Sequence, residues 1–212
     1  MKKILLTFAA IFSLALVSNA QVALGVKTSV GVSMAPNETT YSGQVFDYIN
    51  HEVTYKGSNI VKSIGVFGQK KFGYLFGRAE LSYMTYTQEY DVRSFVQFGQ
   101  GTQNVFEKYE FIDFQVLAGV THENLRFGVG PVAHMLVGYA PALGFISGYS
   151  DNNRAITYGL TTTVGLDAGR FHIDVRYENN FKTIGQHISY GDRKSGFEGK
   201  PHVVNITLGV SF

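Results

Sequence analysis

The chain has 212 residues, only 16% of them charged, with 17 Phe, 13 Tyr and 24 Gly and neither cysteine nor tryptophan. The lack of cysteine excludes disulfides, thiolate metal sites, thiol nucleophiles and a lipid-modified N-terminal cysteine. The charged fraction is well below the roughly one quarter of a soluble domain. With 18 basic against 16 acidic residues and no basic run, the sequence predicts no nucleic-acid partner.

The first 20 residues have the parts of a secretory signal peptide. Lys2 and Lys3 form a positive start, residues 4–17 are apolar, and residues 18–20 offer a small-residue cleavage site. The apolar run is shorter than the ~20 residues of a membrane-spanning helix. We therefore expect cleavage after Ala20 and export of the mature chain.

Apolar residues alternate with small or polar ones along the rest of the chain, which is the period of a β-strand. In the first such segment, Val30 and Val32 share one face, while Gly31 and Ser33 share the other. Eight segments follow this pattern: 22–34, 58–68, 75–86, 108–120, 125–139, 155–168, 171–181 and 202–212.

The connections between these segments alternate in length. Those expected to be long and polar are 35–57, 87–107, 140–154 and 182–201. Those expected to be short are 69–74, 121–124 and 169–170. Long loops at one end and tight turns at the other are typical of a bacterial outer-membrane protein. The sequence therefore predicts an all-β fold, an eight-stranded antiparallel up-and-down transmembrane β-barrel over residues 21–212, in the outer membrane.

Alternation alone is equally compatible with a soluble barrel of the lipocalin kind, which turns its apolar face inward. The interior of an eight-stranded barrel is filled by few side chains, and the apolar face here is too bulky for it, whereas the Gly-, Ser- and Thr-rich face fits. We therefore expect the apolar face to contact lipid. The residues that do not follow this division are Lys62 on the lipid side and Phe67, Phe76, Met84 and Leu117 on the inner side.

Four short stretches resemble the Bacteroidota outer-membrane β-barrel family, which includes PorT-type proteins and OmpX-like small barrels. They are Glu80-Leu81-Ser82-Tyr83, Gly130-Pro131, Asp174-Val175-Arg176-Tyr177 and Leu208-Gly209-Val210-Ser211-Phe212. The terminal Phe212 also resembles the signal read by the outer-membrane barrel-assembly machinery. PorT-type members are associated with type IX secretion and gliding, so the resemblance implies an outer-membrane location and a role in an envelope complex.

The inner face of the predicted barrel carries a set of charged and titratable side chains. They are Arg78, Glu80, Asp113, Arg126, His134, Asp174, Arg176 and Glu178. Buried charges must pair, because an unpaired ion inside a protein is costly. We interpret the set as a structural network that closes the lumen; the alternative is a gated ion path or a proton-linked switch through His134.

Catalytic, cofactor and metal sites are not predicted. The remaining candidates for a His–Ser–acid site are His51, Glu52, His122, Glu123, His187, Ser189 and His202. Their spacing indicates no convergence on one bond, and no HExxH or GxSxG motif occurs. Asp151-Asn152-Asn153 lacks the spaced acidic array of a calcium loop, so we expect a polar turn there.

The predicted function is non-enzymatic: a structural or accessory role in an envelope protein complex, with a secretion-linked complex as the sharper version of this hypothesis. The expected partners are outer-membrane lipid and lipopolysaccharide, the assembly machinery, and other outer-membrane proteins. Two alternatives remain open, a lipid A-modifying enzyme and a stand-alone surface adhesion barrel. The aromatic residues of the long loops fit protein or glycan contact, or an aromatic girdle.

Overall fold

The computed structural model describes residues 22–34, 40–44, 50–96, 99–140, 149–153, 155–182, 185–190, 193–195 and 202–212. The regular elements in these ranges are strands: β1 (Ala23–Met34), β2 (Thr40–Gln44), β3 (Asn50–Phe72), β4 (Leu75–Val96), β5 (Gly99–His122), β6 (Leu125–Ala140), β7 (Tyr149–Asn153), β8 (Ile156–Ala168), β9 (Phe171–Asn180), β10 (Gly185–Tyr190), β11 (Arg193–Ser195) and β12 (His202–Ser211). Within these ranges there is no helix with the length and apolarity to cross a membrane. The predicted signal peptide, residues 1–20, lies outside the described residues.

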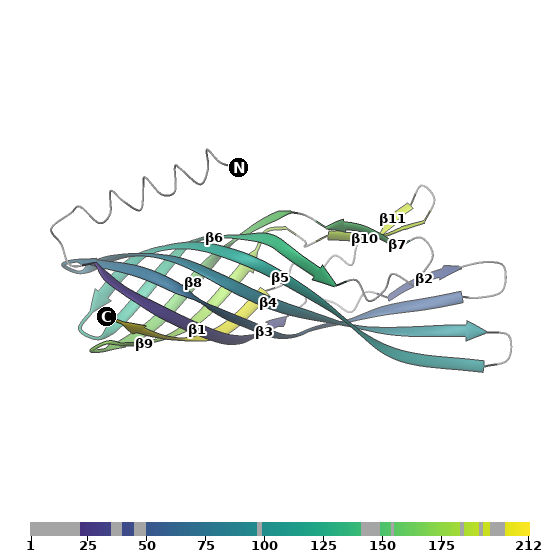
Figure 1. Ribbon diagram of the computed structural model, residues 1–212, viewed down its shortest axis with the longest axis horizontal. Helices are drawn as coiled ribbons and strands as arrows, with labels where there is room; N and C mark the ends of the chain where they lie inside the picture. The colour runs from purple at the N-terminus through teal and green to yellow at the C-terminus, as the bar shows by residue number, and fades with distance from the viewer. Residues whose placement is uncertain are drawn as a thin grey trace.

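Eight antiparallel strands form one sheet that closes in a ring (Figure 1). Their order, β1-β12-β9-β8-β6-β5-β4-β3, follows the chain around the ring, and pairing of β1 with β3 closes it. Outside the ring, β2 continues along the edge of β3, and β7, β10 and β11 form a separate three-stranded sheet. The predicted all-β, up-and-down arrangement of eight strands is thus confirmed.

The strands of the ring are strongly staggered. The stagger can be measured by going once around the ring, from each residue to the residue beside it on the next strand. Starting from Ser33 on β1, the residues passed are Val203, Glu178, Thr161, Gly130, Leu117, Arg78 and Gln69, and the path returns to β1 at Ala23. The return point, Ala23, lies ten residues from Ser33. In an eight-stranded ring this stagger corresponds to a strand tilt of about 40° and a radius of roughly 8 Å. The interior is therefore only wide enough for side chains.

One end of the ring, the turn end, carries three tight turns and the C-terminus. Each turn has two residues, and the first of each has a positive φ: Gly73 (61°), Glu123 (53°) and Gly169 (63°). The positive φ matches the twist of the paired strands in two-residue hairpins. The three short connections were therefore predicted at the right places, but residues 69–72 and 121–122 belong to β3 and β5.

The predicted loop 87–107 is wrong, because most of it is strand. β4 and β5 stay paired without a break from Leu75 with Val120 to Val96 with Gly99. Figure 1 shows this hairpin projecting past the ring, away from the C-terminus. The segment is polar in composition, but every second residue still packs inward, as Tyr90 and Val92 do. Backbone pairing of a hairpin does not require apolar side chains on both faces. The expected loops 35–57, 140–154 and 182–201 likewise contain β2, the start of β3, β7, β10 and β11.

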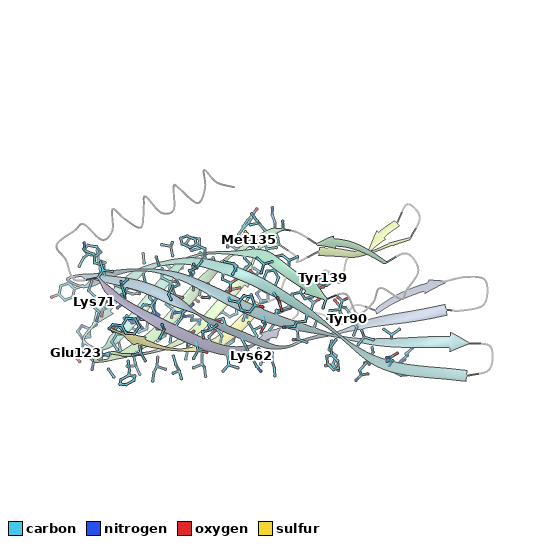
Figure 2. All side chains as sticks on the ribbon, in the orientation of Figure 1. Lys62, Lys71, Tyr90, Glu123, Met135 and Tyr139 are labelled. Atoms are coloured by element: carbon cyan, nitrogen blue, oxygen red, sulfur yellow. The ribbon has the colours of Figure 1, made fainter. Side chains whose placement is uncertain are left out.

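The apolar face of the sheet points out of the ring. Large apolar side chains are exposed on every strand of it, among them Ile64, Leu81, Val116, Val164 and Leu208. Figure 2 shows Met135 and Lys62 on this outer side. The inner-side exceptions expected from the pattern, Phe67, Phe76, Met84 and Leu117, are buried or partly buried inside, as predicted.

Candidate functional site: the polar interior of the ring

The interior of the ring is filled by polar side chains arranged in levels along its axis. β9 contributes to each polar level, because its alternate residues all point inward: His172, Asp174, Arg176, Glu178 and Asn180. From the turn end, the levels are a rim cluster (Lys71, Asp167, His172, Ser211), a central network (Lys27, Gln69, Arg78, Glu80, Gln115, Arg126, Asp174, Arg176) and a histidine cluster (Asp113, His134, Glu178, Asn180). An aromatic cap follows them (Val61, Tyr86, Tyr109, Phe111, Tyr139, Val203).

In the central network, the Glu80 carboxylate is surrounded by cations. Arg176 binds it with two nitrogens, Nη1 to Oε2 at 2.6 Å and Nη2 to Oε1 at 2.8 Å. Arg78 Nε lies 2.6 Å from Oε1, and the Lys27 ammonium pairs with Oε2. The Glu80 side chain is completely buried. A carboxylate in this position is stable only because its charge is compensated on several sides.

Asp174 is the second anion of the central network. Arg126 Nη2 donates to its Oδ1 at 2.7 Å, and Arg176 Nη2 donates to its Oδ2 at 2.9 Å. Arg78 approaches the same Oδ2 at 3.3 Å. Phe67 closes the side of the network, with its ring 3.9 Å from the Arg78 guanidinium carbon. The arginines are thus held by both charge and stacking.

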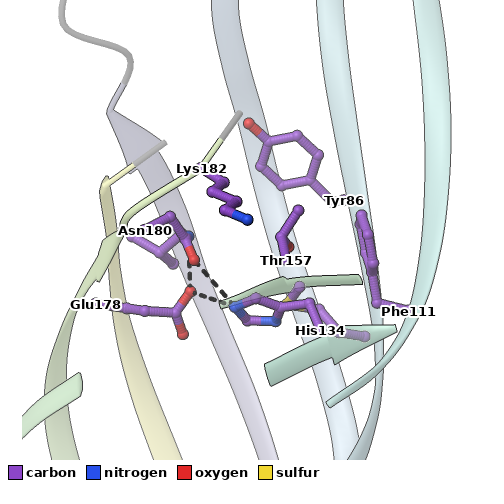
Figure 3. Close-up of a pocket in the computed structure, with 9 residues that line it drawn as sticks. Tyr86, Phe111, His134, Thr157, Glu178, Asn180 and Lys182 are labelled. Atoms are coloured by element: carbon purple, nitrogen blue, oxygen red, sulfur yellow. Dashed lines mark hydrogen bonds and ion pairs between the residues drawn. The ribbon is translucent and has the colours of Figure 1, made fainter. Parts of the chain in front are cut away.

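The histidine cluster holds His134 between two carboxylates. Nδ1 lies 2.7 Å from Asp113 Oδ1. On the other side of the ring, Nε2 lies 3.1 Å from Glu178 Oε1, a contact drawn in Figure 3. Asn180 turns its amide oxygen toward the same Nε2, at 3.1 Å, and donates its amide N–H to Glu178. Both ring nitrogens face acceptors, an arrangement that is satisfied when both carry a proton and His134 is an imidazolium.

With His134 charged, the charges of the three polar levels below the cap balance, apart from Lys71. The interior cations are Lys27, Arg78, Arg126, His134 and Arg176, and the interior anions are Glu80, Asp113, Asp167, Asp174 and Glu178. These levels therefore contain five charges of each sign, besides the half-exposed Lys71 at the rim.

The aromatic cap covers the histidine cluster on the side away from the turn end. Tyr109 and Tyr139 both donate to the buried Glu107 carboxylate, at 3.0 and 2.9 Å. Tyr109 stacks on Phe111, with ring centroids 6.3 Å apart. Below the cap, two cavities of about 20 and 30 Å³ lie against Glu178, each with room for a water molecule or two.

The rim cluster was missed as a set by sequence reasoning. His172 Nδ1 lies 2.8 Å from Asp167 Oδ1, and its Nε2 lies 3.2 Å from Ser211 Oγ. Lys71 and Arg126 also pair with Asp167, at 2.9 and 2.8 Å. Asp167 and His172 face each other across the two-residue turn after β8, so the hairpin pattern alone could have paired them. Lys27 was also missed, although it lies on the polar face of the first predicted strand.

All eight predicted interior residues lie inside the ring and take part in this network. Of the other histidine and acidic candidates, those whose side chains the structure describes do not converge. His122 and Glu123 are exposed at the turn end, whereas His202 lies at the opposite end of β12, where it stacks on Tyr177. The side chains of His51, Glu52, His187 and Ser189 lie outside the described residues. The expected turn at 151–153 is wrong, because these residues belong to β7.

Among the described residues, no group of three His, Asp or Glu side chains is placed to hold a metal ion. No protein-family model matches the chain, and no curated protein is found to be similar to it.

Proposed function

We propose that the protein is an integral outer-membrane β-barrel whose solid interior suits it to a structural or accessory role in an envelope protein complex. In this proposal residues 1–20 are removed as a signal peptide, and Phe212 is read by the assembly machinery. The observation that carries the proposal is the inverted polarity of the ring, with an apolar outer wall around charged side chains. Such a wall is stable against lipid and unfavourable against water.

The dimensions of the apolar wall support a membrane location. On β8 the outward residues run from Ile156 to Leu166, over ten positions. At about 3.3 Å per residue and a tilt of about 40°, this gives a band roughly 25 Å tall, the height expected of an outer-membrane strand.

Exposed aromatic residues lie at both edges of this wall. Phe72, Tyr74, Phe171 and Phe212 are exposed at the turn end, and Tyr83, Tyr158, Tyr177 and Phe181 toward the other end. Two such belts are typical of the interfaces on either side of a membrane. Phe212 is 79% exposed, which leaves it accessible to a receptor for the final strand.

The filled interior favours an anchor over a conduit. The described interior offers only small cavities, and its charges are engaged with one another. We therefore expect partners to bind the outer wall or the projecting β3–β4–β5 strands. A subunit of a secretion-linked assembly of the PorT type is the sharper form of this proposal.

The test is gentle detergent extraction of the native protein, followed by affinity capture and mass spectrometry. The proposal expects recovery from the outer-membrane fraction, heat-modifiable migration on a gel and co-purification with defined outer-membrane proteins. Recovery in a soluble fraction would refute the membrane location. Migration as a single species, with no effect of deletion on any other envelope protein, would refute the accessory role and favour an adhesion barrel.

The enzyme alternative makes a separate expectation. A lipid A-modifying activity would change the mass of lipid A when the gene is deleted. An unchanged lipid A mass would exclude that substrate while leaving the accessory role standing.

A further inference from the structure

The rim cluster has the contacts of a nucleophile–base–acid triad. Ser211 Oγ, His172 and the Asp167 carboxylate are joined in series, at 3.2 Å from Oγ to Nε2 and 2.8 Å from Nδ1 to Oδ1. The three residues come from three strands, β12, β9 and β8. A hydroxyl, an imidazole and a carboxylate in this order are recognised by geometry rather than by sequence position.

The hydrogen bonds of His172 fix the tautomer that such a triad needs. An ionised carboxylate only accepts hydrogen bonds, so Nδ1 carries the proton that faces Asp167. In the neutral ring, Nε2 then presents its lone pair to Ser211 Oγ. His134, the other interior histidine, is different, because both of its nitrogens face acceptors and neither can take a proton.

The surroundings hold this arrangement in place. The ring of Phe67 packs edge-on against His172, with centroids 5.2 Å apart. Asp167 is bound by Arg126 and Lys71, which keep it ionised and fixed in position. Ser211 is also within 3.4 Å of the Arg170 carbonyl oxygen, a competing acceptor for its hydroxyl. The hydroxyl therefore has two possible acceptors, of which His172 is the closer.

The cluster lies at the turn end of the ring. Ser211 is buried, with 8% of its surface exposed, whereas Arg170 and Phe212 beside it are exposed. The proposal below therefore requires a substrate to reach Oγ from the water at the turn end, past Arg170 and Phe212, without entering the central network.

We propose that Ser211 is an activated nucleophile for acyl transfer from a carboxylic ester, with His172 as general base and Asp167 as the positioning residue. Ser211 Oγ attacks the ester carbonyl carbon while its proton passes to His172 Nε2. The ester C–O bond then breaks, and the leaving alkoxide takes that proton as an alcohol. Water hydrolyses the acyl-serine by the same route, giving the carboxylic acid and restoring Ser211. This activity goes beyond the proposed function and would replace the expectation that the chain is not an enzyme.

The experiment uses the full chain, purified in detergent and checked for its β-sheet circular dichroism spectrum. It is treated with a fluorophosphonate probe, which phosphonylates activated serines, and separately with p-nitrophenyl acetate. The proposal expects labelling at Ser211 by peptide mass spectrometry, none at this position in Ser211→Ala, and at least a tenfold slower rate in His172→Gln. Ser82→Ala, which removes another buried serine of the interior, should label at the wild-type rate.

A second readout separates chemistry from structure. The labelling rate should rise with pH through one ionisation, and this step should vanish in His172→Gln while the folded spectrum is kept. Asp167→Asn should slow labelling, because the amide can stabilise the wrong tautomer. Absence of labelling in the folded wild type, or equal labelling of Ser211→Ala, overturns the proposal. Neither result depends on whether the protein inserts into membranes, which heat-modifiable migration tests separately.

Discussion

Glu80 on β4 and Arg176 on β9 form a two-pronged ion pair across the interior of the ring, with N–O distances of 2.6 and 2.8 Å. Both side chains are almost fully buried. The pair joins strands that are not neighbours in the sheet. It therefore ties opposite walls of the ring together, which backbone pairing alone cannot do.

Replacing Glu80 with Gln should strongly destabilise the ring. The change leaves Lys27, Arg78 and Arg176 close together without their shared anion, and breaking a buried pair in this way costs about 3–5 kcal/mol. Urea unfolding of the purified protein, followed by circular dichroism, measures the loss.

Glu110→Gln is the matched control for that change. Glu110 pairs with Lys108 at 2.8 Å, but on a partly exposed surface. An exposed pair contributes little to stability, because water and salt screen it. If both substitutions lowered stability equally, the central network would not be a main source of stability.

His134→Gln should destabilise the protein by about 3 kcal/mol, because it removes the cation between Asp113 and Glu178. Adding Asp113→Asn to that variant should recover a large part of the loss, since one buried anion then disappears. The measurement is a double-mutant cycle of unfolding free energies. Simple additivity of the two substitutions would contradict the arrangement described for the histidine cluster.

Gly165→Ala should disturb the central network through space. A Cβ at this position would clash with Asp174 Oδ1 and lie 2.9 Å from Arg126 Nη2. The Asp174–Arg126 pair would have to move, and we expect a loss of about 1–3 kcal/mol.

Gly77→Ala provides the control on the outer wall. A Cβ there meets no atom within 4 Å, so stability should change by less than about 0.5 kcal/mol. Unfolding midpoints of the two variants, compared side by side, test whether the glycines of the inner face are required by close contacts.

Leu160→Arg tests the proposed membrane location. Leu160 is on the outer wall, near the middle of the apolar band. Arginine at the midplane of a membrane barrel costs about 2–4 kcal/mol, so the variant should insert poorly into lipid vesicles, as measured by heat-modifiable migration. Leu160→Val should insert normally. Equal insertion of both variants would refute the assignment of this wall to lipid.

The fold was predictable from sequence because outward apolar residues alternate with inward small or polar residues along the strands of the ring. The eight strands and their inner faces follow from positions such as Asp174 and Arg176, two residues apart on one side. The extension of β4 was not predicted, since its polar composition concealed a continued alternation at Tyr90 and Val92. Along this stretch the alternation of inward and outward side chains, and not the polar composition, indicates the structure.

The contacts of the interior could not be predicted in the same way. The stagger of the whole ring decides which residues of β4 meet which residues of β9 across the interior. No local sequence pattern contains this information. The pairing of Asp167 with His172 needs only one short hairpin, but the approach of Ser211 also needs the register between β12 and β9. Local neighbours are therefore readable from sequence, whereas contacts across the ring are not.

The seam between β1 and β12, where the two ends of the chain meet, has an unusual make-up. Its inward residues are mostly small, such as Gly25, Gly31 and Gly209, and Lys27 is its one ionic group among the described side chains. The remaining buried ions belong to strands in between. When the first and last strands join during assembly, Lys27 is the one charged group of these two strands that must be desolvated. Closure of the ring therefore carries only a small desolvation cost.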